Sequence, residues 1–385
     1  MMKNIFDEID QLNSTYIDIW EDVCNLESPS HDKARVDQVG AYFQRMAEKQ
    51  NWKIEVFAQD RVGDVVCITM NPESPRQPIV LSGHMDTVHP VGSFGIPAVK
   101  RDEFKLYGPG AMDCKGGIVA GFLAMEALNN CGFKNRPVMM LLQSNEEIGS
   151  GLKNKAPIEY ICQKAEDAVA FLNLEGHEDF FAGKACLIRK GIAGFKFHIQ
   201  GVETHASYCA REGASAIHEA AYKIIEIEKM KDDNGITCNC GIISGGTATN
   251  TVPGQCEFRV DARFSSQEQY QQLVTNLQKI ADTVYVSGCH CTMEQTNLRP
   301  AMELNEKNIA LLNICNELFE KNGLSKLEIG KRTGGSDAAD VTCRGIPCID
   351  SIGVGGGRAH SIEEYGNIHS LAESAKRIAS VVFGI

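Results

Sequence analysis

Several side chains between residues 81 and 147 are of the types that bind divalent metals. They are His84, Asp86, Asp113, Glu146 and Glu147. Imidazole nitrogens and carboxylate oxygens are ordinary ligands of first-row divalent ions. The sequence therefore predicts a metal-dependent hydrolase site in this stretch.

Short apolar runs of strand length precede several of these groups. Residues 78–82 (PIVLS) come before His84, and residues 138–143 (VMMLLQ) come before the two glutamates. A third run, residues 168–174 (AVAFLNL), ends in Glu175. Ligands at the ends of neighbouring strands can converge at one edge of a sheet. We therefore expect an α/β domain whose sheet carries the site at this edge.

His84 and Asp86 form a candidate ligand and orienting pair. In an extended chain the side chains alternate, so these two project to the same side. A carboxylate that accepts the second ring N–H of a metal-bound histidine fixes its tautomer and raises its basicity. The structural alternative is a satisfied core histidine beside a turn aspartate.

The other acids have structural alternatives of their own. Asp113 follows the turn Gly108-Pro109-Gly110 and opens a helical run, where aspartate is also a favoured N-cap. Glu146 and Glu147 are adjacent and repel each other unless a cation lies between them. One can bind the metal while the other acts as general base. Without a metal they would form a solvated loop.

The pattern changes near residue 189, where a second domain is predicted. Residues 191–298 follow the order strand, helix, strand, strand, helix, strand, which suggests an inserted α+β sandwich. We therefore expect three segments: 1–188 and 299–385 form the first domain, and 189–298 form the insert. In the first domain, residues 31–50 are expected to form a helix, and Ser30 is its expected N-cap. Residues 345–354 are the expected last buried strand, and they precede a glycine-rich loop and His360.

The composition excludes several classes of partner. With 385 residues, a formal net charge of −12 and 43% hydrophobic residues, the chain is an acidic globular protein, which argues against nucleic acid or an anionic membrane as partner. The N-terminus is not typical of a signal peptide, and no run reaches transmembrane length. The 15 cysteines are scattered through apolar runs, which favours a reducing cytoplasm. The pairs Cys238/Cys240 and Cys289/Cys291 are interpreted as packing residues.

Motifs along nearly the whole chain resemble those of one family. They are SGHMDTVHP, GPGAMDCKGG, NEEIGS, LEG, GGTATNTVPGQCEFRVDAR, GGSDAAD and GRAHSIEEY. Together they resemble the co-catalytic dinuclear zinc metallopeptidase and aminoacylase family, which includes glutamate carboxypeptidase, acetylornithine deacetylase and succinyl-diaminopimelate desuccinylase. The resemblance implies an α/β mixed-sheet catalytic domain flanked by helices, with an inserted ferredoxin-like lid that dimerises.

The resemblance also implies a role for each ligand. His84 and Glu175 would bind one divalent ion, and Glu147 and His360 would bind a second. Asp113 would bridge the two ions and would be followed by a non-proline cis peptide bond. The expected metal is zinc, with cobalt or manganese as alternatives.

Catalytic and substrate-binding roles are implied in the same way. Asp86 would orient His84, and Glu146 would be the general base. His205 would stabilise the oxyanion, often from the partner subunit of a homodimer. The residues expected to bind substrate are Arg263, Asn250, Gly335, Ser336 and Arg358. For Arg263 the alternative is an exposed strand arginine.

The expected reaction is hydrolysis of an amide that releases an amino acid with a free α-carboxylate. The segments GGSDAADVTCRGIPCIDSIGVGG and HSIEEY most resemble the glutamate carboxypeptidase group, so a small peptide is the expected substrate. An N-acyl-amino-acid deacylase and a dipeptidase or tripeptidase are alternatives. A metal-free binding protein is a further alternative, but it predicts missing ligands, and all of them are present.

Overall fold

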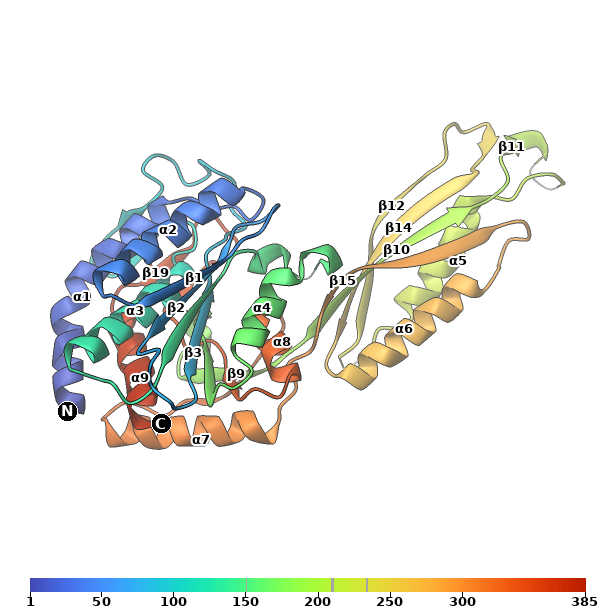
Figure 1. Cartoon of the computed structure of the whole chain (residues 1–385). Helices are drawn as coiled ribbons and strands as arrows, with labels where there is room; N and C mark the ends of the chain where they lie inside the picture. The colour runs from blue at the N-terminus through green and yellow to red at the C-terminus, as the bar shows by residue number, and fades with distance from the viewer. Residues whose placement is uncertain (150, 209–210, 233–234) are drawn as a thin grey trace.

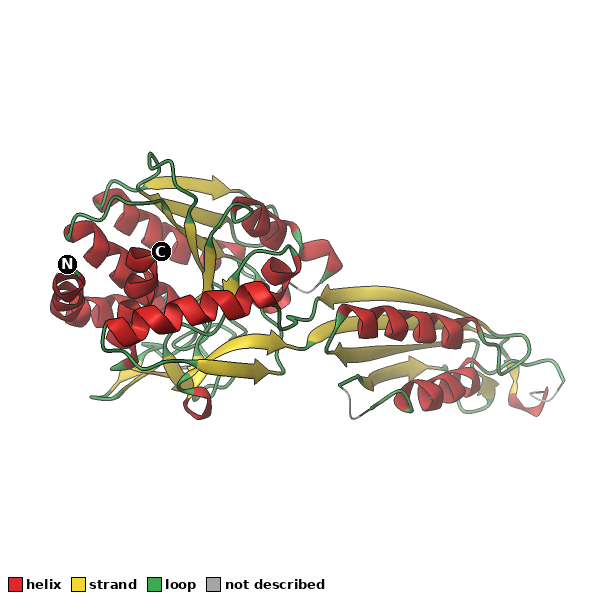
Figure 2. Cartoon of the chain, turned by 90° about the horizontal axis from the view of Figure 1, so that it is seen from below, coloured by secondary structure: helices red, strands yellow, loops and turns green. Residues whose placement is uncertain are grey.

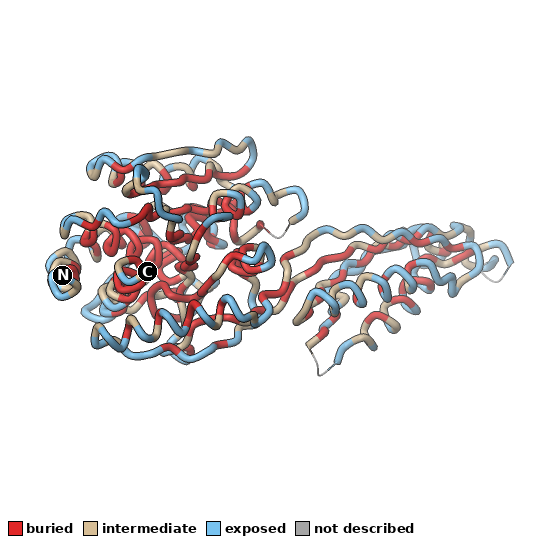
Figure 3. The backbone as a smooth tube through the Cα atoms, turned by 60° about the horizontal axis from the view of Figure 1, so that its bottom comes forward, coloured by how far each residue is buried: buried red, intermediate tan, exposed pale blue. Residues whose placement is uncertain are grey.

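The computed structural model describes residues 1–149, 151–208, 211–232 and 235–385. The chain forms a larger body that contains both termini and a smaller elongated body that extends away from it (Figure 1). Buried residues form a separate core in each body (Figure 3). No helix within the described ranges combines the length and apolar character needed to cross a membrane.

A six-stranded mixed sheet forms the centre of the larger body. Its strand order is β1-β2-β6-β3-β7-β17. Strands β6, β3, β7 and β17 are parallel to one another, and β1 and β2 add an antiparallel edge. The strands are β1 (Lys53–Phe57), β2 (Val65–Met70), β3 (Ile79–His84), β6 (Val138–Gln143), β7 (Ala170–Asn173) and β17 (Cys348–Ile349).

Helices cover both faces of this sheet. The first face packs against α1 (Met2–Asn25), α2 (Lys33–Lys49), α3 (Lys115–Asn130), α7 (Glu306–Lys321) and α9 (Ser370–Gly384). The second face packs against α4 (Ala156–Lys164) and α8 (Asp337–Cys343). Side chains alternate between the two cores: Leu81 faces the first and Val80 the second. Because both faces are buried, the central strands are continuous apolar runs.

Two small sheets extend the larger body. Strands β9 (Lys184–Arg189) and β16 (Glu328–Arg332) form a parallel pair. A five-stranded sheet has the order β4-β5-β19-β18-β8. Its strands are β4 (Lys100–Arg101), β5 (Lys105–Tyr107), β8 (His177–Glu178), β18 (Gly355–Gly357) and β19 (Tyr365–Asn367).

The smaller body, which we call the lid, is an antiparallel sheet of order β12-β14-β10-β15. Its two helices lie on one face of the sheet (Figure 2). Its main elements are β10 (Gly191–Gln200), α5 (Ala216–Glu228), β12 (Thr237–Gly245), β14 (Gln255–Phe264), α6 (Gln267–Asp282) and β15 (His290–Arg299). The order and the sheet are those of a ferredoxin-like fold. Short strands β11 (Thr204–His205) and β13 (Thr251–Val252) pair at the tip farthest from the larger body (Figure 1).

Alternation along β14 decides which lid residues face the helices. Phe258, Val260 and Ala262 are buried in the lid core. Asp261 and Arg263 therefore project from the open face of the sheet, which no lid helix covers. The two connections between the bodies lie side by side, because Arg189 and Met302 exchange backbone hydrogen bonds of 3.0 Å.

The predicted α/β catalytic fold with a ferredoxin-like insert is confirmed. The predicted strand at 345–354 is regular only over Cys348–Ile349. Ser30 was wrongly predicted as a helix cap, because Asp32 accepts from Arg35 N while Ser30 donates to Asp86. The boundaries at 188/189 and 298/299 stay a prediction.

Candidate active site

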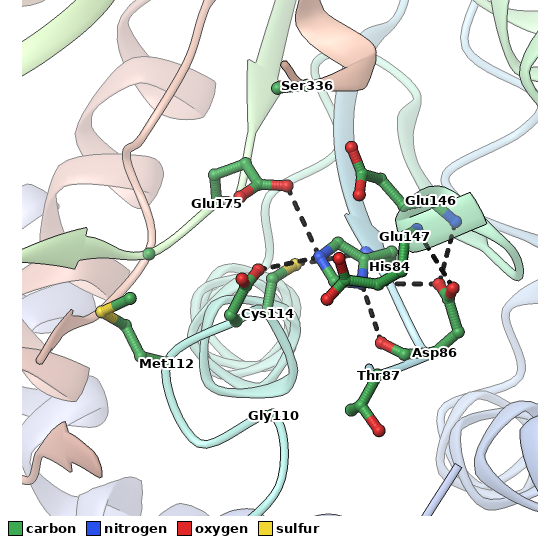
Figure 4. Close-up of polar contacts among 12 residues, drawn as sticks. His84, Asp86, Thr87, Gly110, Met112, Cys114, Glu146, Glu147, Glu175 and Ser336 are labelled. Carbon is green, nitrogen blue, oxygen red and sulfur yellow. Dashed lines mark hydrogen bonds and ion pairs between the residues drawn. The ribbon is translucent and has the colours of Figure 1, made fainter. Parts of the chain in front are cut away.

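Three parallel strands bring candidate ligands to one edge of the central sheet. Strand β3 ends at His84, and Glu175 lies just beyond β7. Glu146 and Glu147 begin a 3₁₀ turn, η1 (Glu146–Ile148), just beyond β6. The carboxyl ends of parallel neighbours share one edge, so these side chains converge as predicted (Figure 4).

The first group of ligand atoms surrounds His84, whose side chain is 2% exposed. His84 Nε2 lies 3.0 Å from Asp113 Oδ1 and 3.5 Å from Glu175 Oε1. The backbone amide of His84 donates to Cys114 Sγ at 3.2 Å. His84, Asp113 and Glu175 therefore form one cluster of metal-ligating types, of which Figure 4 labels His84 and Glu175.

The second group surrounds His360, which follows β18. His360 Nε2 lies 3.3 Å from Asp113 Oδ2 and 3.3 Å from Glu147 Oε2. The two oxygens of Asp113 thus face the two histidines separately. This is the arrangement that a bridging carboxylate requires. The peptide bond between Asp113 and Cys114 is cis, as the family resemblance implied.

Asp86 is fully buried and connects several parts of the site. Its Oδ1 accepts from Glu146 N at 3.0 Å, and its Oδ2 accepts from Glu147 N at 3.2 Å and from the Ser30 hydroxyl at 2.6 Å. The nearest acceptor for His84 Nδ1 is the Asp86 backbone carbonyl at 2.9 Å, with Oδ1 at 3.4 Å. Asp86 therefore orients His84 chiefly through its backbone, while its carboxylate fixes the turn that bears both glutamates (Figure 4).

The loop that carries Asp113 is held by Glu364, which is 1% exposed. Glu364 Oε1 accepts from Met112 N at 2.9 Å and from Asp113 N at 3.0 Å. Its Oε2 accepts from Gly110 N at 3.3 Å and bonds His89 Nε2 at 2.8 Å. A buried carboxylate with this many donors is strongly anchored, so the position of Asp113 depends on Glu364.

Glu146 is bound by an arginine that ends the last lid strand. Arg299 Nη1 forms an ion pair with Glu146 Oε1, and Nη2 donates to the Glu146 carbonyl at 2.8 Å. Nη2 also lies 3.6 Å from Asp337 Oδ1. Arg299 is 4% exposed. The predicted general base is thus linked directly to the connection between the lid and the larger body.

The electrostatics of the cluster fit bound cations. Burial is the largest cause of the raised pKa of Glu147, which reaches about 8, and the charge of Asp113 adds to it. Burial also raises the pKa of Glu175 well above its usual range, again followed by Asp113. Hydrogen bonds to Asp113 and Glu147 raise the pKa of His360 to about 11. These shifts reflect an excess of negative charge that a cation would balance, so the donor set fits two divalent ions.

A cavity of about 690 Å³ joins this cluster to the lid. Arg263 and Ile192 line it from the open face of the lid, and Gly335 lines it from the larger body. Arg263 Nε lies 2.8 Å from Asp261 Oδ1. The structure thus brings Arg263 to the cavity that contains the acidic cluster.

His205 and Asn250 lie elsewhere in the chain. Both are exposed near the β11–β13 pair at the lid tip, where Ala206 N donates to the Asn250 carbonyl at 2.8 Å. Arg263 pairs with Ile192 near the start of β10, at the opposite end of the lid sheet, and lines the cavity. Asn250 and Arg263, predicted as an anchoring pair, are therefore not together in one chain. His205 does not reach the ligand cluster of its own chain either.

Two other predicted cavity residues are corrected. Ser336 is fully buried at the N-cap of α8, where its hydroxyl accepts from Asn173 Nδ2 at 2.9 Å and does not line the cavity. Arg358 projects into a different cavity beside Lys105, Tyr365 and Glu363. Its side chain is 68% exposed, because the positive-φ turn before His360 directs it outward.

Some residues of the site carried no signal in the sequence. Glu364 lies within the GRAHSIEEY motif, yet only Arg358 and His360 of that motif were predicted as site residues. Arg299, Lys331 and Arg332 line the cavity but follow no recognisable spacing. Their positions depend on how the lid and β16 pack, which local patterns do not encode.

The fold and the ligand cluster define a hydrolase built for divalent metals, and comparisons with known proteins agree. Residues 187–289 match a family described as a peptidase dimerisation domain, and residues 65–219 match peptidase family M28. Carboxypeptidase G2 of Pseudomonas sp. (strain RS-16) is 23% identical over 372 residues, which cover 95% of this chain and 88% of that protein.

Two further likenesses come from a deacetylase and a peptidase. Acetylornithine deacetylase of Myxococcus xanthus is 30% identical over 215 residues, covering 52% of this chain and 53% of that protein. The crystal structure of a tripeptidase from Staphylococcus aureus superposes with a TM-score of 0.78 at 23% identity, covering 96% of this chain and 97% of the other. The similarity to the tripeptidase structure supports the fold only.

The chain is thus similar to metallopeptidases and aminoacylases, with carboxypeptidase G2, acetylornithine deacetylase and succinyl-diaminopimelate desuccinylase among its relatives. It is accordingly a metallo-hydrolase that acts on amide bonds.

We predict that Asp86→Ala lowers both metal affinity and kcat/KM by ~10–100-fold, the usual effect of losing a group that orients metal ligands. The substitution leaves two backbone amides of the glutamate turn and the Ser30 hydroxyl without their acceptor. Metal content after dialysis and initial rates measure the effect. Asp18→Ala, which removes an exposed partner of Arg101, is the control. Full metal content and activity in Asp86→Ala would contradict this role.

Proposed function

We propose that this protein is a dinuclear metal-dependent exopeptidase of the glutamate carboxypeptidase type. In this proposal it cleaves an amide bond and releases an amino acid with a free α-carboxylate. The proposal rests on the position of Arg263, which lines the same cavity as the metal-ligating cluster. A guanidinium can grip a carboxylate with two parallel hydrogen bonds.

Two divalent ions are proposed, with zinc as first choice and cobalt or manganese as alternatives. His84 and Glu175 would hold one ion, Glu147 and His360 the other, and Asp113 both. When bound, the ions would polarise the amide carbonyl and lower the pKa of the attacking water. The close approaches of both histidines to Asp113 support this assignment.

Glu146 is proposed as the general base and acid. One carboxylate oxygen takes a proton from the attacking water and later delivers it to the amine nitrogen that leaves. The guanidinium of Arg299 holds this carboxylate in place from the side of the lid. Asp86 fixes the backbone of Glu146 from the opposite direction.

The remaining groups are proposed to come from a second chain. His205 would donate a hydrogen bond to the developing oxyanion, and Asn250 lies on the same lid tip. Because this tip points away from the cavity of its own chain, a homodimer is needed to deliver them (Figure 1). The match of residues 187–289 to a dimerisation domain supports this.

The proposed dimer surface is the outer edge of the lid sheet with the adjoining helix. Among the described residues no strand pairs with the outer edge of β12, which exposes Ile242 at 60% and Ile243 at 53%. Helix α5 packs beside β12 and exposes Ile225 at 53%. An unpaired edge strand with exposed apolar side chains is a surface on which a second copy can add its own strand.

The substrate class is tested by a metal assay followed by a turnover panel. We expect about two metals per chain and preference for peptides and aroyl amides that end in glutamate. Preference for N-acetyl or N-succinyl amino acids would instead favour an N-acyl-amino-acid deacylase, which the 30% identity to acetylornithine deacetylase supports as a second candidate. Preference for free dipeptides or tripeptides would favour a dipeptidase or tripeptidase. Absence of turnover after zinc or cobalt is restored would refute the proposal.

Glu146→Gln is expected to lower kcat by ~10²–10⁴-fold, because an amide cannot accept the proton of water. Metal content should stay at the wild-type level, since Glu146 is not one of the proposed ligands. Metal analysis and steady-state rates on the same preparation separate the two effects. A variant with wild-type kcat would remove Glu146 from this role.

A mixing experiment tests whether His205 acts across the dimer. His205→Ala alone should lower kcat by ~10²-fold, as expected for a lost oxyanion donor. When inactive His205→Ala and Glu146→Gln proteins exchange subunits, each mixed dimer gains one intact site, so about a quarter of wild-type activity should return. If His205 acts within its own chain, every site keeps one lesion and no activity returns.

A further inference from the structure

The cavity is lined by five arginine and lysine side chains, and four of them already have an acidic partner. Arg189 pairs with Asp350, Arg263 with Asp261, Arg299 with Glu146, and Arg332 with Glu178. The fifth is Lys331. Throughout the described residues, the Lys331 ammonium has no hydrogen-bond or ion-pair partner.

The backbone around Lys331 is constrained although its side chain is free. Lys331 pairs with Ile188 on β9, and the register of β16 and β9 shifts between Gly330 and Lys331. Such an irregularity redirects the side chains that follow it. The next residue is fixed: Arg332 donates to the Gly176 carbonyl at 2.9 Å and pairs with Glu178. Lys331 is thus an exposed residue on a fixed strand at the wall of the cavity.

The acidic side chains of the metal-ligating cluster do not need Lys331 as a counter-ion. Glu146 is already neutralised by Arg299, and the proposed ions balance Asp113, Glu147 and Glu175. A flexible, unpaired ammonium at the wall of a substrate cavity is therefore available for an anion that arrives with the substrate.

We propose that Lys331 selects substrates whose released amino acid has an acidic side chain. This inference rests on the proposed function, in which Arg263 binds the α-carboxylate. Two cations on separate bodies then hold the two carboxylates: Arg263 belongs to the lid and Lys331 to the larger body. An amino acid with a neutral side chain engages Arg263 alone.

The test compares two substrates that share an acyl group and end in glutamate or in glutamine. These side chains have nearly the same shape and differ in charge. We expect wild-type protein to favour glutamate by about 10–100-fold in kcat/KM, the size of one charged hydrogen bond. In Lys331→Met this ratio should fall close to one, chiefly through a higher KM for the glutamate substrate.

Lys326→Met is the matched control, because Lys326 is an exposed lysine of the same body that pairs with Glu320. It should keep the wild-type ratio. Lys331→Glu should invert the preference in favour of glutamine. An equal loss on both substrates in Lys331→Met, or an unchanged ratio, would overturn the inference.

Product binding separates failure of this inference from failure of the proposed function. Calorimetry on zinc-loaded protein would compare free glutamate with free glutamine in wild type and in Lys331→Met. If wild type cleaves neither substrate, the proposed function fails, and the calorimetric preference still decides the role of Lys331. If wild type cleaves both without preference, only the inference about Lys331 fails.

Discussion

The position of Asp113 between two imidazoles is the constraint on which the rest of the site depends. Its two oxygens lie 3.0 Å and 3.3 Å from the ring nitrogens of His84 and His360. A buried carboxylate can hold such a position only if its own backbone is fixed. Glu364 supplies this by accepting from the amides of Met112 and Asp113. Two distant parts of the chain are therefore needed before both imidazoles can face this carboxylate.

Part of the cluster of metal-ligating types was predictable because His84, Glu147 and Glu175 each follow a strand that the sequence marks clearly. Runs such as VMMLLQ are apolar throughout, since both faces of the central sheet are buried, and parallel strands end at a shared edge. The role of Asp86 was only partly predictable. The spacing of two placed it beside His84, but its carboxylate accepts from two backbone amides and from Ser30, and no spacing rule relates residues so far apart.

Other features depend on packing that the sequence does not express. Asn250 and Arg263 are close in sequence, yet Asn250 directly precedes β13 at the lid tip and Arg263 lies near the opposite end of β14. Ser336 belongs to a recognisable loop, but the start of α8 takes its hydroxyl as a cap. Arg299 had no signal at all. Its contact with Glu146 requires room that Gly335 leaves, since a Cβ there would come within 2.7 Å of Arg299 Cδ.

The two connections to the lid end in buried arginines, and this limits how the lid can move. Arg189 is bound to Asp350 and to the Gly334 and Gly335 carbonyls, while Arg299 is bound to Glu146. Removing one member of a buried charge pair costs about 3–5 kcal/mol, so both arginines stay attached while the lid moves. A rotation must then occur beyond them, within the strands of the lid itself. Because Ile192 pairs with both Arg263 and Arg299 across the sheet, Arg263 lies at the same level of the lid sheet as Arg299, and a rotation beyond this level leaves both in place. The group proposed to bind substrate and the group that holds Glu146 would then keep their positions relative to the acidic cluster.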